Sequence, residues 1–312
     1  MKKLLLRSAL LGMASTMLFC QTIFAQIVPD KETMEYYTAE WTGERMADGR
    51  PQVPDELLKR LENISIEEAW GVLRAEGYHN QFEGGWTMLR PNEAFVGRAL
   101  TAQYMPMRPD INKRILDNGH KEGRIGASNS WPIDMLQKGD VYVADCYGKV
   151  IDGTLIGDNL GNAIYSKTGT GVVFDGGSRD LEGLGHIEGF NAFVRGFDPS
   201  YLTETMMTGI NFPVRIGRAT VFPGDVVLAK NEGVIFIPPH LLEKVVITAE
   251  FIGLKDKFGH QKLREGVYTP GQIDGRWSDE IKSDFLNWLD QHPDLIPMTR
   301  EELDAYMKDR TW

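Results

Sequence analysis

The sequence predicts an α/β protein: a layered core of strands and helices with an N-terminal arm and a C-terminal helical tail. Two Gly-Asp turns that each precede an apolar strand, at 138–145 and 223–230, indicate equivalent strands in this core. Between them, a helical pattern over 159–166 and the apolar run Val172-Val173-Phe174 predict a helix followed by a buried strand. After Leu241 the apolar spacing becomes helical, which predicts the tail.

The 312 residues suit a single domain with added arms. We expect four parts: a signal peptide at 1–25, an extended arm at 26–55, the core at 56–255 and the helical tail at 256–312.

The first residues have the pattern of a secretory signal. Three basic residues, Lys2, Lys3 and Arg7, precede an apolar stretch from Ala9 to Phe24. A membrane anchor is the alternative, but the stretch is shorter than the roughly 20 residues that a spanning helix needs, and polar residues interrupt it. We expect cleavage near Ala25 and a periplasmic or secreted protein.

The charge balance limits the partners. The chain has 34 Lys and Arg against 44 Asp and Glu, a formal net charge of −10. Such an acidic surface argues against nucleic acid or an anionic membrane as a partner. Of the two cysteines, Cys20 falls in the expected signal, and Cys146 follows an apolar strand pattern that predicts a buried, inert thiol.

The expected arm is polar, but Tyr36, Tyr37 and Trp41 give it apolar anchors, so it should lie on its own core or on a neighbouring subunit. Ser65 and Glu68 form a capping box that predicts the start of a helix.

Further along the chain, prolines and glycines predict a loop from Pro106 to Gly126. In the tail, Trp277, Trp288 and Trp312 need cover, so the tail should pack on the body or on a partner subunit.

The candidate site lies between Gly157 and Asp180. The apolar run ending at Phe174 breaks into two glycines, and Arg179 and Asp180 follow directly. An Arg fork suits a planar carboxylate, and an Asp oxygen suits a hard cation. The six histidines are scattered, so this site favours Mg²⁺ or Mn²⁺ over Zn²⁺. The alternative for Asp180 is a helix cap on the turn at Leu181.

Asp158 begins the predicted helix. Free backbone amides of Asn159 and Leu160 could bind a carboxylate or keto oxygen there. The Asp158 side chain would serve as a general base or hold a metal-bound water.

The Gly157-Asp158 and Arg179-Asp180 pairs, at this spacing, resemble the signature of the RraA-like family. This family includes metal-dependent 4-hydroxy-4-methyl-2-oxoglutarate and 4-carboxy-4-hydroxy-2-oxoadipate aldolases. The resemblance runs from about Ser65 to Leu263.

The resemblance implies a swivelling β/β/α fold and trimers or hexamers with active sites between subunits. It implies that Asp180 binds Mg²⁺ or Mn²⁺, that Arg179 binds the 2-oxo acid, and that Asp158 takes part in catalysis. Gly157, Asn159 and Leu160 would contact the substrate. The implied reaction releases pyruvate from a 4-hydroxy-2-oxo acid, with oxaloacetate decarboxylation as a companion activity.

The sequence departs from the family at two places. Lys230-Asn231-Glu232 replaces a more acidic turn, and Lys255 stands where the aldolases place a glutamate from a neighbouring subunit. The adjacent Asp256 is the candidate replacement. Because some family members are non-catalytic ribonuclease inhibitors, a small-carboxylate-binding or regulatory protein is the second hypothesis.

Overall fold

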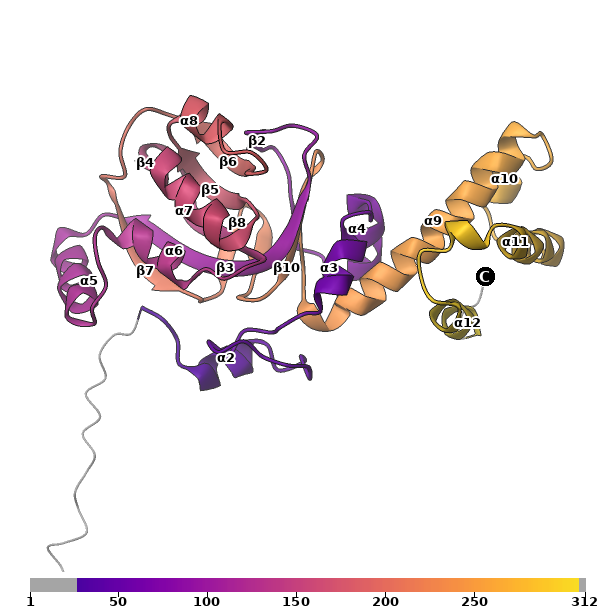
Figure 1. Cartoon of the computed structure of the whole chain (residues 1–312), viewed down its shortest axis with the longest axis horizontal. Helices are drawn as coiled ribbons and strands as arrows, with labels where there is room; N and C mark the ends of the chain where they lie inside the picture. The colour runs from indigo at the N-terminus through magenta and orange to yellow at the C-terminus, as the bar shows by residue number, and fades with distance from the viewer. Residues whose placement is uncertain (1–26, 309–312) are drawn as a thin grey trace, which may run out of the picture.

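The computed structural model describes residues 27–308, so the expected signal peptide and Trp312 lie outside the described residues. A mixed sheet forms the centre, with helices and a small hairpin around it (Figure 1). The helices of four or more residues are α2 (Lys31–Tyr37), α3 (Asp55–Leu61), α4 (Ile66–Ala75), α5 (Pro109–Lys121), α6 (Trp131–Met135), α7 (Asp158–Thr168), α8 (Leu181–Gly185), α9 (Leu242–Arg264), α10 (Pro270–Ile273), α11 (Asp279–Gln291) and α12 (Arg300–Lys308). The strands are β1 (Phe82–Glu83), β2 (Thr87–Met88), β3 (Phe95–Pro106), β4 (Asp140–Thr154), β5 (Val172–Ser178), β6 (Ala192–Phe197), β7 (Thr205–Ile210), β8 (Val214–Ile216), β9 (Ala219–Val221), β10 (Val226–Lys230) and β11 (Gly233–Ile237).

The large sheet has the order β1-β11-β10-β3-β4-β5-β6-β2, and β7 also pairs with β3. Strands β3, β4, β5 and β6 run parallel to one another, whereas β10 and β7 pair antiparallel with β3, and β2 pairs antiparallel with β6. The carboxyl ends of parallel strands meet at one edge of a sheet, and loops that leave this edge commonly form ligand sites.

Three layers make up the core. On β3, Leu100 and Ala102 contribute to a buried cluster that includes Ile133 of α6 and Ile164 of α7. The alternate residue Ala99 faces the other side, where the β8–β9 hairpin covers the sheet. Alternation of this kind follows from the two-residue period of a strand. The predicted α/β class and β/β/α layering are confirmed.

Helices α3, α4 and α9 pack on β10 and β11 through a second buried cluster. Helix α4 begins at the predicted capping box, in which the Glu68 amide donates to Ser65 Oγ at 3.1 Å and the Ser65 amide donates to Glu68 Oε2 at 2.9 Å.

The arm, predicted to be extended, contains the short helix α2 instead. The Asp30 carboxylate accepts a hydrogen bond from the Thr33 amide at 2.8 Å and so caps α2. Tyr37 then packs edge-on against Phe222, with ring centroids 5.7 Å apart, so the arm lies on its own core.

The tail has a hydrophobic cluster of its own. Helix α9 runs unbroken to Arg264, across the expected boundary between the core (56–255) and the tail (256–312), and leads away from the sheet (Figure 1). Trp277 and Trp288 are buried there against Phe258 of α9 and neighbouring apolar side chains. The tryptophans therefore find cover within the tail itself.

The prediction of a loop between Pro106 and Gly126 is wrong in part, because helix α5 occupies most of this segment. Pro109 stands in the first turn of this helix, where its missing N–H costs nothing and its fixed φ is already helical. Within residues 27–308, no helix combines the length and apolar character that crossing a bilayer requires.

Candidate active site

The pairing of two parallel strands places the two motif halves side by side. Beyond the end of β4, the Leu155 amide donates to Gly177 O at 3.0 Å, and the Arg179 amide donates to Ile156 O at 3.0 Å. The Ser178 hydroxyl also donates to Ile156 O at 3.0 Å. The chain therefore reaches Gly157 next to the residues that follow β5.

Gly157 makes room for the Arg-Asp pair. A Cβ added at Gly157 would lie 2.1 Å from Asp180 Oδ2 and 3.2 Å from Arg179 Nε. The φ of Gly157 is −122°, which any residue can adopt, so a side chain here would crowd the Arg-Asp pair rather than strain the backbone. The structure thus brings together Gly157, Arg179 and Asp180, as the sequence predicts.

Asp180 has an unusual backbone for a residue with a side chain, with φ 56° and ψ 46°. Aspartate tolerates this left-handed region better than most residues, and such conformations concentrate at functional sites. Although Asp180 precedes α8, its side chain makes no capping hydrogen bond. The capping alternative is therefore not what the structure shows, and Asp180 Oδ2 lies 3.5 Å from Arg179 Nη1 instead.

Arg179 has a second partner that the sequence does not reveal. Its guanidinium carbon lies 5.1 Å from the ring centroid of Tyr201, a cation–π distance. The Arg179 and Asp180 side chains are each 36% exposed, so both remain accessible to a ligand.

Both side chains line an open hollow of about 580 Å³. Its other charged lining residues are Asp158, Glu182 and Asp198. Hydrogen bonds from the Ser200 hydroxyl and amide hold the pKa of Asp198 below its usual range, so this carboxyl is ionised at neutral pH. With four carboxylates and one guanidinium, the hollow suits a cation better than a free anion.

Asp158 is the first residue of α7 and lies against α8. A Cβ at Gly183 would be 2.8 Å from Asp158 Cβ, so the two helices approach closely at this point. Asp158 Oδ1 accepts a hydrogen bond from the Asn159 amide at 2.8 Å.

This bond corrects one expectation. The Asn159 amide is not free for a ligand, because the adjacent carboxylate already accepts its proton. The Leu160 amide makes no hydrogen bond with the described part of the chain, so it is the amide of this helix start that remains available.

The donor set fits a hard divalent cation that keeps most of its water. Asp180 offers carboxylate oxygen, and the nearby carboxylates of the hollow could accept hydrogen bonds from coordinated water. Residues 27–308 contain no cluster of three or more His, Cys, Asp or Glu side chains placed to hold a metal.

The two departures from the family lie elsewhere. Asn231 makes two hydrogen bonds to Asn92: its Nδ2 donates to Asn92 Oδ1, and its Oδ1 accepts from the Asn92 backbone amide, both at 2.7 Å. Lys255 Nζ lies 4.3 Å from the Trp277 ring centroid in the tail, and Asp256 is exposed. No α9 residue lines the hollow within the described chain, and α9 leads away from α7 and α8 (Figure 1).

The model of the RraA-like family, described as Aldolase/RraA, matches residues 55–236. The chain belongs to the RraA-like family. As an RraA-like protein it is 29% identical over 194 residues to DlpA of Legionella pneumophila, an alignment that covers 61% of this chain and 29% of DlpA. It is also 27% identical over 129 residues to a Halalkalibacterium halodurans protein named "Putative 4-hydroxy-4-methyl-2-oxoglutarate aldolase", covering 41% of this chain and 60% of that protein. The matched segments thus span less than two thirds of either relative.

Solved structures share the fold. Streptomyces coelicolor RraAS2, described as an unusual member of the RNase ES inhibitor RraA family, superposes with a TM-score of 0.58 at 25% identity, over 68% of this chain and 100% of RraAS2. An uncharacterized protein from Pseudomonas syringae gives a TM-score of 0.58 at 21% identity, over 72% of this chain and all of that one. The RraA-like domain is therefore the common part, and the tail lies beyond the matched family segment.

Proposed function

We propose that this RraA-like protein is a divalent-metal-dependent aldolase that cleaves a 4-hydroxy-2-oxo acid and releases pyruvate. The supporting observation is that Arg179 and Asp180 meet at Gly157 in a hollow whose other charged groups are carboxylates. The family includes aldolases, and one distant relative is named for this reaction.

Asp180 would hold Mg²⁺ or Mn²⁺ through a carboxylate oxygen. When bound, the cation would offset the negative charge that develops on the keto oxygen as the bond between C3 and C4 breaks. The Arg179 guanidinium would donate two parallel hydrogen bonds to the substrate carboxylate, and its contact with Tyr201 would keep it in position. The Leu160 amide at the start of α7 would donate one more hydrogen bond to the same anion.

Asp158 would move the proton of the substrate. Its Oδ1 is held by the Asn159 amide, which leaves Oδ2 to accept the proton of the 4-hydroxyl group as that oxygen becomes a carbonyl and the C3–C4 bond breaks. Asp158 would then return this proton to C3 of the resulting enolate, which gives pyruvate. The same groups would support oxaloacetate decarboxylation, in which the C3–C4 bond breaks, CO₂ leaves and C3 takes up a proton.

Two further parts of the proposal concern assembly and location. We place a homotrimer or hexamer around the site, in which exposed Asp256 on α9 would approach the hollow of a neighbouring subunit. We also propose export to the periplasm or beyond, on the pattern of residues 1–25.

A substrate screen tests the catalytic proposal. Pyruvate release from 4-hydroxy-2-oxo acids and from oxaloacetate is measured with Mg²⁺ or Mn²⁺, and again after chelation with EDTA. Activity should depend on the metal, fall at least about 100-fold in Asp180→Asn, and persist in Asp294→Asn, which changes an exposed tail aspartate in the same way. Equal rates in wild type and Asp180→Asn would refute the site.

One observation favours a second function, a non-catalytic protein that binds small carboxylates. At the position of the family's glutamate, Lys255 is instead held near Trp277 within its own tail. If wild type releases no pyruvate from any compound yet binds pyruvate or oxalate, with loss of binding in Arg179→Met, the second function replaces the first.

A further inference from the structure

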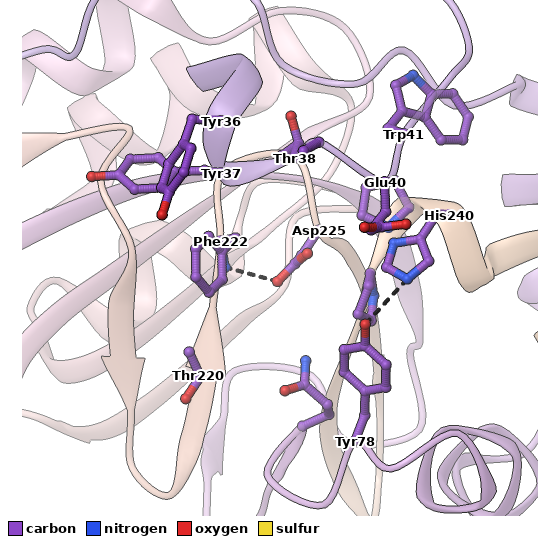
Figure 2. A pocket seen from close by; sticks show the side chains of 14 residues that line it. Tyr36, Tyr37, Thr38, Glu40, Trp41, Tyr78, Thr220, Phe222, Asp225 and His240 are labelled. Atoms are coloured by element: carbon purple, nitrogen blue, oxygen red, sulfur yellow. Dashed lines mark hydrogen bonds between the residues drawn. The ribbon is translucent and has the colours of Figure 1, made fainter. Parts of the chain in front are cut away.

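A second cavity lies where the N-terminal arm crosses the core, away from the hollow at Asp180. It has a volume of about 300 Å³, is partly open to solvent, and is lined by the arm segment 36–41, the turn from Phe222 to Asp225, and residues 238–240 (Figure 2). Tyr78 closes another side.

The cavity contains a buried carboxyl group with one unused oxygen. Asp225 is 3% exposed, and its Oδ2 accepts a hydrogen bond from the Phe222 amide at 2.7 Å. No hydrogen bond from a described residue reaches its Oδ1, and this oxygen is not among the fully buried atoms of the described chain. Burial raises the pKa of Asp225 to about 7, because desolvation penalises the charged form. A buried acid of this kind calls for a partner.

The other Gly-Asp turn of the core shows how the chain supplies such a partner elsewhere. Asp140 has the same local arrangement: it follows a glycine with positive φ, and its Oδ2 accepts the amide of the residue three positions earlier, Gln137, at 3.0 Å. Asp140 Oδ2 also lies 2.8 Å from Arg50 Nη2, and its Oδ1 lies 3.5 Å from Arg98 Nε.

Among residues 27–308, no arginine or lysine lines the cavity at Asp225. The arm places Arg50 against Asp140 of one Gly-Asp turn. Beside Asp225 of the other turn, the arm places aromatic side chains instead, and a cavity remains. The cation that neutralises Asp140 is thus replaced at Asp225 by an open volume beside the carboxyl group.

The remaining lining favours a positively charged organic group. Tyr37 and Phe222 pack edge to face, and Trp41 and Tyr78 add further aromatic surface. Aromatic faces next to carboxylates attract organic ammonium ions through the ring quadrupole.

The titratable neighbours add no competing positive charge at neutral pH. Glu40 on the arm is an acid at the edge of the cavity (Figure 2). Burial lowers the pKa of His240, and its Nε2 lies 3.2 Å from the Tyr78 hydroxyl, so this histidine is neutral at pH 7.

We propose that this cavity binds a small organic ammonium ion, a quaternary or primary amine, with Asp225 as its counterion. The aromatic side chains enclose the alkyl groups, and the carboxylate meets the positive nitrogen. A cavity of about 300 Å³ has room for a small ammonium ion such as choline.

Binding should depend on pH in a defined direction. The cation requires ionised Asp225, whose pKa is about 7, so affinity should rise about tenfold between pH 6 and pH 8. At pH 6, binding should release a proton to the buffer.

Isothermal titration calorimetry with choline tests the proposal on the whole protein at constant ionic strength. The neutral isostere 3,3-dimethyl-1-butanol is the matched ligand, and two buffers of different ionisation enthalpy measure proton release. Choline should bind with the stated pH dependence, and the alcohol should bind at least tenfold more weakly at pH 8. Equal affinity for both ligands, affinity independent of pH, or no saturable choline binding would overturn the proposal.

Variants locate the site. Asp225→Asn keeps an oxygen for the Phe222 amide and should weaken choline binding at least tenfold at pH 8 while removing its pH dependence. Glu35→Gln, which removes an equal charge from an exposed position on α2, should bind as wild type does. Trp41→Leu tests the aromatic wall independently and should also lose affinity, so retained binding in both Asp225→Asn and Trp41→Leu would refute this location.

Discussion

Replacing Gly157 with alanine tests the geometry of the catalytic hollow with a single methyl group. The new Cβ would lie 2.1 Å from Asp180 Oδ2, although real Cβ contacts essentially never fall below 3.0 Å. The Asp180 carboxylate would therefore have to move by about 1 Å. A displacement of about 1 Å at a reacting centre can lower the rate on the order of 100-fold, or about 2.7 kcal/mol of transition-state stabilisation.

The same substitution should leave the fold intact. At φ −122° alanine is allowed. Alanine also reduces the conformational freedom of the unfolded chain, which stabilises the folded state by roughly 0.4–1 kcal/mol. An off-rotamer Asp180 would cost about 0.5–1.5 kcal/mol, so the free energy of unfolding should change by no more than about 1 kcal/mol.

The assay pairs pyruvate release with Mn²⁺ binding measured by electron paramagnetic resonance. Gly185→Ala is the matched control, because a Cβ there meets no atom within 4 Å and the position lies on the adjacent α8. We expect Gly157→Ala to lose both activity and Mn²⁺ affinity, and Gly185→Ala to keep both. If Gly157→Ala retained wild-type Mn²⁺ affinity and rate, the close approach of Gly157 and Asp180 would have no functional role.

Three further predictions concern buried groups. Burial raises the pKa of Asp225 from 3.8 to about 7, so the native state binds this proton more tightly than the unfolded state, and the free energy of unfolding should fall as pH rises from about 4 to 8. The loss, on the order of 4 kcal/mol, should vanish in Asp225→Asn when urea unfolding is compared across pH. Parallel pH curves for both proteins would contradict this prediction. Arg50 is fully buried and pairs with Asp140 at 2.8 Å, so Arg50→Met should lower the free energy of unfolding by about 3–5 kcal/mol in the same urea assay. A loss below about 1 kcal/mol would show that Asp140 does not need this partner. Burial also raises the pKa of the Cys146 thiol to about 12, so the native protein at pH 8 should react with Ellman's reagent no more than Cys146→Ser does. The wild-type protein should react more than this variant only after unfolding. Rapid labelling of the native thiol would mean that the strand opens.

The N-terminal arm contacts the two Gly-Asp turns of the core in different ways. It places Arg50 against Asp140, next to the start of β4, and it places Tyr37 and Trp41 around the cavity at Asp225. A ligand bound at Asp225 would contact the arm and the core together, so it should also stabilise their packing.

The sequence by itself determined the elements whose signals are local. The apolar run ending at Phe174, the capping box at Ser65 and the paired glycine motifs each depend on neighbouring residues, and the structure has them where the sequence places them. The helix at Pro109 was missed because two prolines and a glycine outweighed its polar helical pattern, although proline is favoured in a first helical turn.

Only the tertiary structure decided which side chains meet. Tyr201 reaches Arg179, and Asp198 faces the same hollow, across loops whose paths no local pattern specifies. The same holds for the two Gly-Asp turns, which look alike in sequence, yet one receives Arg50 from the arm and the other opens on a cavity. The physical reason is that local sequence fixes backbone geometry over a few residues, whereas the neutralisation of a buried carboxyl group depends on whatever the folded chain brings to it from far away.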